Sequence, residues 1–174
     1  MELNKIKKLL FVLPLAALLV LVGCKVSYKF TGASIDYSVV KTISLETFQN
    51  RAAYQWGPMA TMLNEKLSDV FIQQTKLSQV NRGGDLQLAG EITAYDQVNK
   101  SISSDGYSAM VQLKMSVNVR FVNNKNHKED FERTFSATRD FDSSQLLETV
   151  QEELVTQMIN EIVEAIFNAA VANW

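Results

Sequence analysis

Alternation of apolar and polar residues in the middle of the chain predicts β-strands. Between Tyr107 and Phe121 every second residue is apolar, which is typical of a strand with one buried face and one wet face. Shorter alternating runs predict further strands at about 40–48, 86–95 and 131–137. In the second of these runs, the pattern places Leu86, Leu88, Gly90, Ile92 and Ala94 on one face and Tyr95 on the other.

Two other segments have helical spacing of their apolar residues. The first helix is expected over about 58–75, with Pro58 in the first turn, where a missing N–H does no harm. The second is expected over about 143–170, with Asp142 as N-cap and Gln145 completing a capping box. The resulting order is β-α-β-β-β-α. We therefore predict an α+β fold, a two-layer sandwich in which two helices cover one face of a four-stranded mixed sheet.

The N-terminus differs in kind from the rest. Lysines at 5, 7 and 8 precede an apolar run over 9–22, which is too short for a comfortable membrane span of about 20 residues. A short apolar run behind lysines, ending in small residues, indicates an export signal over residues 1–23. A buried helix or a short anchor is the alternative interpretation.

The only cysteine of the chain follows this run. Leu21-Val22-Gly23-Cys24 resembles the bacterial lipobox, and the resemblance implies cleavage after Gly23 and attachment of diacylglycerol to the Cys24 thiol. Residues 24–38 would then be a lipidated tether and docking segment, and 39–174 the α+β domain. No acidic cluster follows Cys24, whereas lipoproteins displayed on the cell surface in some bacterial groups have one. We therefore expect the periplasmic side of the outer membrane.

Charge and residue types exclude several functions. The net charge of −2 is a poor match to nucleic acid, which calls for clustered basic charge. His127 is the only histidine and lies in a polar turn, so neither a metal site nor Ser-His-Asp catalysis is expected. Asp140 and Asp142 are close in sequence, as glycosidase carboxylates can be, but Asp142 already has a predicted capping role. We predict no enzyme activity, no cofactor and no metal.

Three basic residues are candidates for binding an anionic group. Lys114 and Arg120 fall on the wet face of the 107–121 strand, and Arg51 falls in a loop. Solvated charges on a strand and a loop are the simpler interpretation of all three.

Five segments together indicate a family. They are "FTGASI" at 30–35, "NRA" at 50–52, "GDLQLAGEITAYD" at 84–96, "DFDSS" at 140–144 and "NEIVEAIFNAAVANW" at 160–174. In this order and spacing the chain resembles the LptE-type lipopolysaccharide-assembly lipoproteins of Bacteroidota. The resemblance covers essentially the whole chain after Cys24.

The resemblance implies a binding function. LptE-like proteins are anchored in the inner leaflet of the outer membrane, facing the periplasm, and sit in the lumen of the β-barrel LptD as a plug and assembly aid. The expected partners are an LptD-like barrel, the outer membrane through the acyl chains, and lipopolysaccharide as a further ligand. A polar wet face suits a polar barrel lumen. The alternative is a stand-alone periplasmic lipid carrier or another envelope-assembly lipoprotein.

Overall fold

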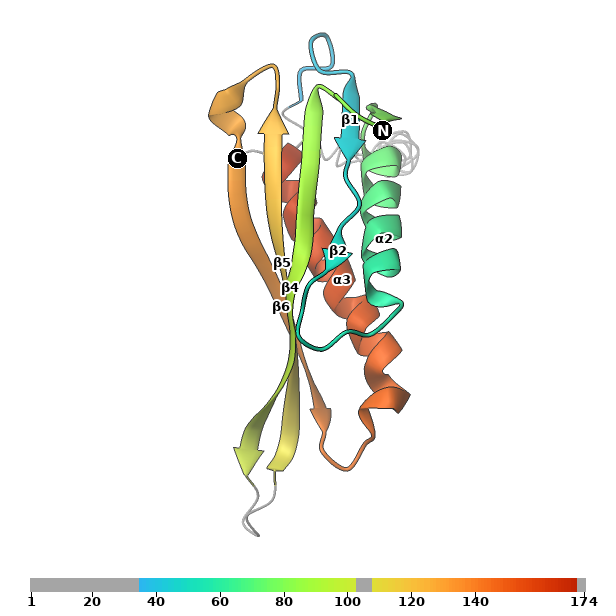
Figure 1. The fold of residues 1–174 in the computed structure, drawn as a ribbon, viewed down its shortest axis with the longest axis vertical. Helices are drawn as coiled ribbons and strands as arrows, with labels where there is room; N and C mark the ends of the chain where they lie inside the picture. The colour runs from blue at the N-terminus through green and yellow to red at the C-terminus, as the bar shows by residue number, and fades with distance from the viewer. Residues whose placement is uncertain (1–34, 103–107, 172–174) are drawn as a thin grey trace, which may run out of the picture. The chain divides into compact units, whose positions relative to one another are not determined.

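The computed structural model describes residues 35–102 and 108–171. Residues 1–34, with Gly23 and Cys24 and most of the predicted tether, lie outside this description. Along the chain the elements are β1 (Thr42–Leu45), β2 (Gln49–Asn50), α2 (Met59–Gln74), β3 (Ser78–Val80), β4 (Leu86–Ile102), β5 (Ser108–Asn123), the 3₁₀ turn η1 (His127–Glu129), β6 (Phe131–Asp142) and α3 (Leu147–Val171), as Figure 1 shows.

All strands belong to one mixed sheet with the order β3-β1-β4-β5-β6, and β2 pairs with β4 beyond the end of β1. Strands β1, β3 and β4 are parallel, whereas β4, β5 and β6 are antiparallel neighbours. The predicted α+β class and mixed sheet are confirmed, but four strands is wrong, because the described sheet has six. The two additional strands, β2 and β3, have two and three residues, which is too short to show alternation.

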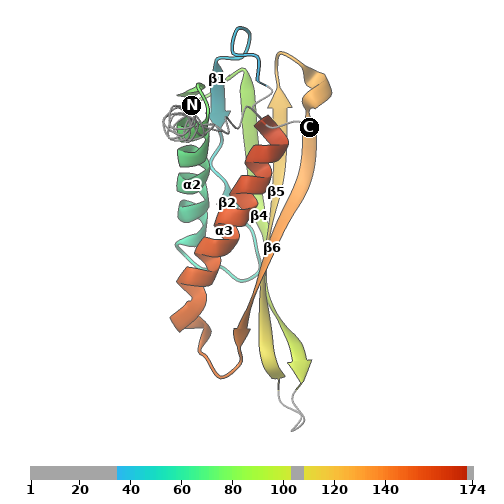
Figure 2. The ribbon, with the colours of Figure 1, turned by 180° about the vertical axis from the view of Figure 1, so that it is seen from behind.

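Both helices lie on the same side of the sheet, as predicted, and Figure 2 shows them from that side. They contact each other through Phe71 and Phe167, whose ring centroids are 5.3 Å apart. Within the part of the chain that the structure describes, α3 is the one helix long and apolar enough to cross a membrane. Its apolar stripe is buried in the common core, so we interpret it as a core helix.

The start of α3 differs from the prediction. The carboxylate of Asp142 accepts hydrogen bonds from the N–H of Ser144 (2.8 Å) and its hydroxyl (2.6 Å), and this closes a turn directly after β6. The helix begins only at Leu147, so the predicted capping box of Asp142 and Gln145 is wrong. Aspartate caps turns as readily as helices, and the sequence does not distinguish the two.

A β-bulge changes the faces of β4. The register between β4 and β5 shifts between Ile92 and Ala94, so Tyr95 faces the core and is fully buried. Its hydroxyl accepts a hydrogen bond of 2.9 Å from the buried amide of Gln151 on α3, and Tyr54 stacks on its ring. The predicted assignment of Tyr95 to the wet face is therefore wrong.

The connection from β1 to β2 is fixed against both layers. Asn64 on α2 accepts from the N–H of Phe48 (2.8 Å) and donates to its carbonyl (2.9 Å). The Phe48 ring is buried over Gly90, where a Cβ would lie only 2.4 Å from a ring carbon. Glycine at this position of β4 lets the connection approach the strand.

Candidate functional site

The sheet face opposite the helices, which we call the open face, is polar along β4, β5 and β6. Near its middle, the hydroxyls of Ser116 and Ser136 lie 2.8 Å apart, and Thr93 donates to the carbonyl of Ser116. Asn118 donates to Glu132 across the same strands. The face therefore presents hydroxyl, amide and charged groups to its surroundings.

Lys114 and Arg120 are exposed on this open face, as predicted. They lie six positions apart on β5, which corresponds to about 20 Å along a strand. The cross-strand neighbours of Lys114 are Asp96 and Thr138, and those of Arg120 are Ala89 and Glu132. Each of the two basic side chains therefore has a carboxylate as a cross-strand neighbour, Asp96 for Lys114 and Glu132 for Arg120.

Arg51 lies elsewhere. Arg51 follows β2, which pairs with the edge of β4 that faces away from β5. Its N–H donates to the carbonyl of Ile92 on β4. The structure thus does not gather Lys114, Arg120 and Arg51 into one pocket.

At the far end of the open face, Asp140 holds two partners. Its carboxylate lies 2.5 Å from the ammonium of Lys100 and 3.0 Å from the amide of Gln112. The hydrogen bond from Lys100, and then that from Gln112, lower the pKa of Asp140 below its ordinary value. Asp140 and Asp142 thus both have structural partners, which leaves no pair of free carboxylates here.

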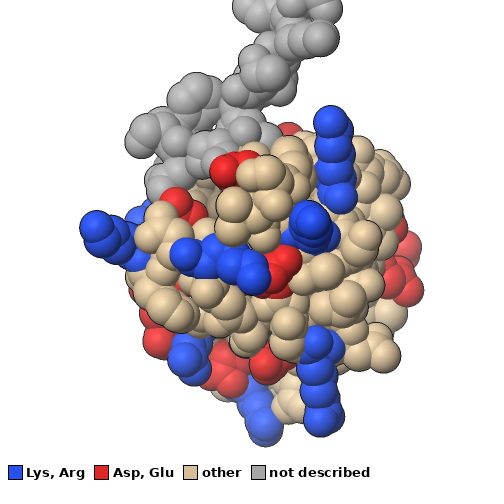
Figure 3. Space-filling model, turned by 90° about the horizontal axis from the view of Figure 1, so that it is seen from above, with Lys and Arg blue, Asp and Glu red and all other residues tan. Residues whose placement is uncertain are grey.

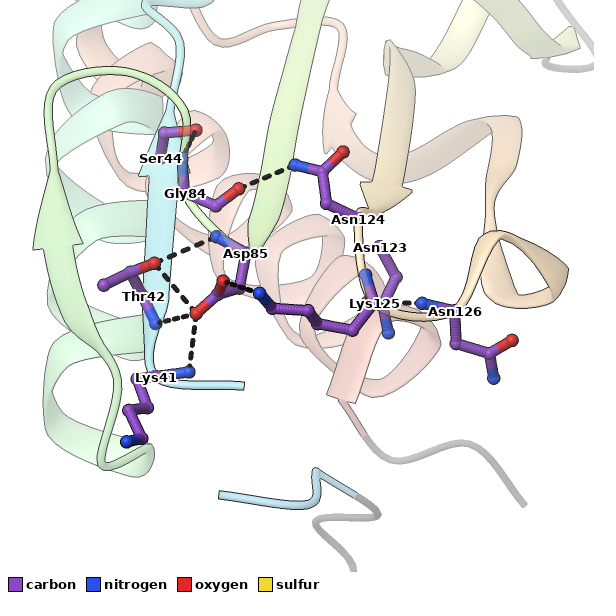
Figure 4. Close-up of polar contacts among 9 residues, drawn as sticks. All are labelled: Lys41, Thr42, Ser44, Gly84, Asp85, Asn123, Asn124, Lys125 and Asn126. Carbon is purple, nitrogen blue, oxygen red and sulfur yellow. Dashed lines mark hydrogen bonds and ion pairs between the residues drawn. The ribbon is translucent and has the colours of Figure 1, made fainter. Parts of the chain in front are cut away.

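A second polar cluster lies at the end of the sheet where β1 and β4 begin and β5 ends. The carboxylate of Asp85 accepts from the N–H groups of Lys41 (2.9 Å) and Thr42 (3.1 Å) and from the Thr42 hydroxyl (3.1 Å). Its other oxygen lies 2.9 Å from the ammonium of Lys125, as Figure 4 shows. These contacts, led by the Lys41 N–H, hold the pKa of Asp85 far below its ordinary value.

The turn after β5 completes this cluster. Asn124 donates from its backbone N–H to the carbonyl of Asp85. Its side-chain amide donates to the carbonyl of Gly84, as Figure 4 shows. His127 is exposed in this turn and lies 2.9 Å from Asp130. Burial acts to raise the pKa of Asp130, but hydrogen bonds from Asn123 and His127 lower it on balance. Among the described residues, no three His, Cys, Asp or Glu side chains gather to hold a metal.

The sequence alone did not reveal the Asp85 cluster. The segment 81–85 has the composition of a turn and nothing more. Lys41 and Lys125 lie 44 and 40 residues from Asp85 along the chain, and no local pattern connects them. Only the alignment of β1, β4 and β5 at one sheet end brings them together.

The sequence model of the LptE family, described as lipopolysaccharide-assembly, matches residues 40–170. The chain belongs to the LptE family. The match spans both helices and all described strands, so the whole two-layer body is the family domain. No curated protein matches the chain.

Solved structures share the fold. An uncharacterized lipoprotein B from Nitrosomonas europaea is 16% identical, with a TM-score of 0.52, covering 73% of this chain and 79% of its own. A hypothetical protein from Chlamydia trachomatis is 10% identical, with a TM-score of 0.54, covering 77% of this chain and 99% of its own. At such low identity these similarities establish the LptE-like fold only.

Membership in the LptE family supports a role in lipopolysaccharide assembly. The LptE family is a family of non-catalytic assembly lipoproteins. This agrees with a site made of polar surfaces rather than of a buried reactive group.

Proposed function

We propose that this protein is an outer-membrane lipoprotein that plugs and helps assemble an LptD-type β-barrel for lipopolysaccharide delivery to the outer leaflet. It acts by binding, not catalysis. The observation that carries the proposal is the family match over 40–170, which covers the complete two-layer body. The Bacteroidota type of the family is part of the proposal and rests on the sequence segments alone.

The described body has the surface that a plug needs. The lumen of a membrane barrel is polar, so a protein that fills it must keep its own core and present a polar exterior. Here the apolar residues of α2, α3 and the inner sheet face form one closed core. The open face is hydrogen-bonded across β4, β5 and β6, and it offers hydroxyls and amides at its middle.

Lys114, Arg120 and Arg51 serve in this proposal as separate contacts. Their separation excludes one shared pocket for a phosphate. Each can instead meet a single anionic group of the barrel wall or of lipopolysaccharide. The test is charge removal one residue at a time, with recovery of the barrel measured for each variant.

The membrane attachment is assigned to Cys24, after cleavage behind Gly23. One acyl chain holds a protein only marginally in a bilayer, whereas two or three give stable attachment to the inner leaflet. Cys24→Ala removes the thiol and with it the diacylglycerol. Metabolic labelling with a fatty acid should mark the wild type and not this variant, and equal labelling of the two would refute the site.

Co-purification tests the partner. The tagged protein, extracted from its own membrane in mild detergent, should bring down one large outer-membrane β-barrel protein in a stable ratio. Mass spectrometry identifies the barrel, and an unrelated outer-membrane lipoprotein with the same tag is the control. Recovery as a free monomer with a bound lipid would contradict the proposal and favour a stand-alone carrier.

A further inference from the structure

We propose that one end of the domain binds the phosphate headgroups of an anionic phospholipid bilayer. This surface, which we call the tether end, consists of the turn 36–41, Lys76 and the turn 124–128. The inference rests on the proposed lipid attachment at Cys24, which brings the domain to a membrane, and adds a second, non-covalent contact.

The tether end lies where the chain enters the described domain, close in sequence to Cys24. Ile35 is the first described residue and comes eleven residues after Cys24, so even a fully extended tether spans only about 40 Å. The turn 36–41 leads directly into β1. The pairing of β1 with β4 and of β4 with β5 places the turn after β5 at the same end of the sheet (Figure 1).

The lysines of the tether end are available to a ligand. Lys41 and Lys128 are exposed, and neither ammonium has an ion-pair partner among the described residues. Figure 4 shows the side chain of Lys41 directed away from the Asp85 cluster. Lys76 lies 5.8 Å over the ring of Tyr37, and the side chain of Lys125 is 42% exposed although it pairs with Asp85.

Carboxylates at the same end have internal partners. Asp36 accepts from the N–H (2.9 Å) and hydroxyl (2.6 Å) of Ser38. Asp85 is held by Lys125 and two backbone N–H groups, and Asp130 pairs with His127. Figure 3, which looks onto this end, shows Lys and Arg side chains projecting around it, with acidic side chains between them and at the margin. Glu129 also lies at this end and accepts hydrogen bonds from the amides of Asn123 and Asn126, so the four lysines stand among four carboxylates. The carboxylates are held by these internal hydrogen bonds, whereas the ammonium groups of Lys41 and Lys128 have no ion-pair partner among the described residues and remain available to a phosphate.

An apolar patch adjoins these lysines. Val39 is 50% exposed in the turn 36–41 and borders a cavity of about 210 Å³. The apolar part of the cavity is formed by Ile35, Val40, Leu86 and Ala170, and Lys125 lies at its edge. An exposed aliphatic side chain beside lysines whose stems are apolar is typical of surfaces that rest in the headgroup region.

The surface formed by α3 opposes contact with an anionic membrane. Helix α3 carries five glutamates and neither lysine nor arginine. A surface of this charge is repelled by anionic lipid, whereas each lysine near such a surface strengthens binding by about fivefold. Under this proposal the domain therefore turns its tether end, and not the α3 side, to the membrane.

Vesicle binding tests the inference without the acyl chains. The mature chain beginning at residue 24, with Cys24→Ser, is sedimented with vesicles of phosphatidylcholine mixed with phosphatidylglycerol, and with vesicles of phosphatidylcholine alone. We expect binding only to the anionic vesicles, and loss of binding at high salt. Lys41→Glu and Lys128→Glu should each weaken binding about tenfold or more, because each reverses a charge.

The matched control is Lys66→Glu, which makes the same charge change on α2 and should alter binding less than twofold. Far-UV circular dichroism checks that each variant is folded. Any of three results would overturn the inference. They are equal binding to neutral and anionic vesicles, an equal loss of binding with Lys66→Glu, and binding only to vesicles that contain lipopolysaccharide. None of these results affects fatty-acid labelling at Cys24 or barrel co-purification, so failure here is distinguishable from failure of the proposed function.

Discussion

Gly90→Ala tests whether the approach of Phe48 to β4 stabilises the fold. An alanine Cβ at this position would lie 2.2 Å from the carbonyl oxygen of Asn118 on β5 and 2.4 Å from a ring carbon of Phe48. The first contact is with backbone that is paired in the β4–β5 ladder, so it cannot move without disturbing that ladder. The second is with a ring fixed by its own buried surroundings.

The expected change in the free energy of unfolding combines two effects of opposite sign. Forcing an additional methyl group into a packed site costs about 1–3 kcal/mol, and two contacts this short argue for the upper part of that range. Replacing glycine by alanine also stabilises the fold by about 0.5–1 kcal/mol, because glycine loses more conformational freedom than alanine on folding. We therefore expect Gly90→Ala to lower the free energy of unfolding by about 1–2 kcal/mol.

Urea unfolding of the mature Cys24→Ser chain, followed by circular dichroism, measures this change. With a slope of about 1–3 kcal/mol per molar urea, the midpoint should fall by about 1 M. Gly57→Ala is the control, since no atom lies within 4 Å of its added Cβ, and its midpoint should be unchanged or slightly higher. Equal midpoints for the two alanine variants would refute the packing argument.

Three further substitutions test other contacts in the same unfolding assay. Asp85 has a pKa in the fold below its ordinary value of 3.8, so it stabilises the fold above that pH and loses this effect as the pH falls further. Asp85→Asn should therefore lower stability at pH 7 and flatten the loss of stability below about pH 4; an unchanged acid profile would contradict this. Tyr95→Phe should cost about 1–3 kcal/mol, because the buried amide of Gln151 loses its acceptor, and a neutral result would mean that the amide finds another. Asn64→Ala should cost about 2 kcal/mol by leaving the N–H and carbonyl of Phe48 unpaired, whereas a loss within error would show that water replaces the amide.

Long periodic segments were predictable from the sequence. The helix expected over 58–75 is α2 at Met59–Gln74, and the alternation from Tyr107 to Phe121 is β5 at Ser108–Asn123. Each of these elements buries one complete face against the core, and that burial is what produces the periodic pattern.

Elements fixed by distant partners were not predictable. Strands β2 and β3 exist because β4 and β1 offer free edges to short segments, not because their own residues alternate. The bulge at Ile92 and Ala94 reverses the faces of β4, and an alternating pattern continued through it places Tyr95 wrongly. The exposure of Lys114 and Arg120 was predicted correctly, but their separation from Arg51 depends on the strand order.

The place of β1 in the sheet has a mechanical consequence. The turn 36–41 leads into β1, which is hydrogen-bonded to β3 on one side and β4 on the other, and Asp85 accepts from the N–H groups of Lys41 and Thr42 where β1 begins. With the proposed attachment at Cys24, tension from the bilayer would act along an interior strand and load the bonds on both of its sides in shear, instead of unzipping an edge one bond at a time. In that geometry the sheet would resist peeling when the domain is held by its N-terminus.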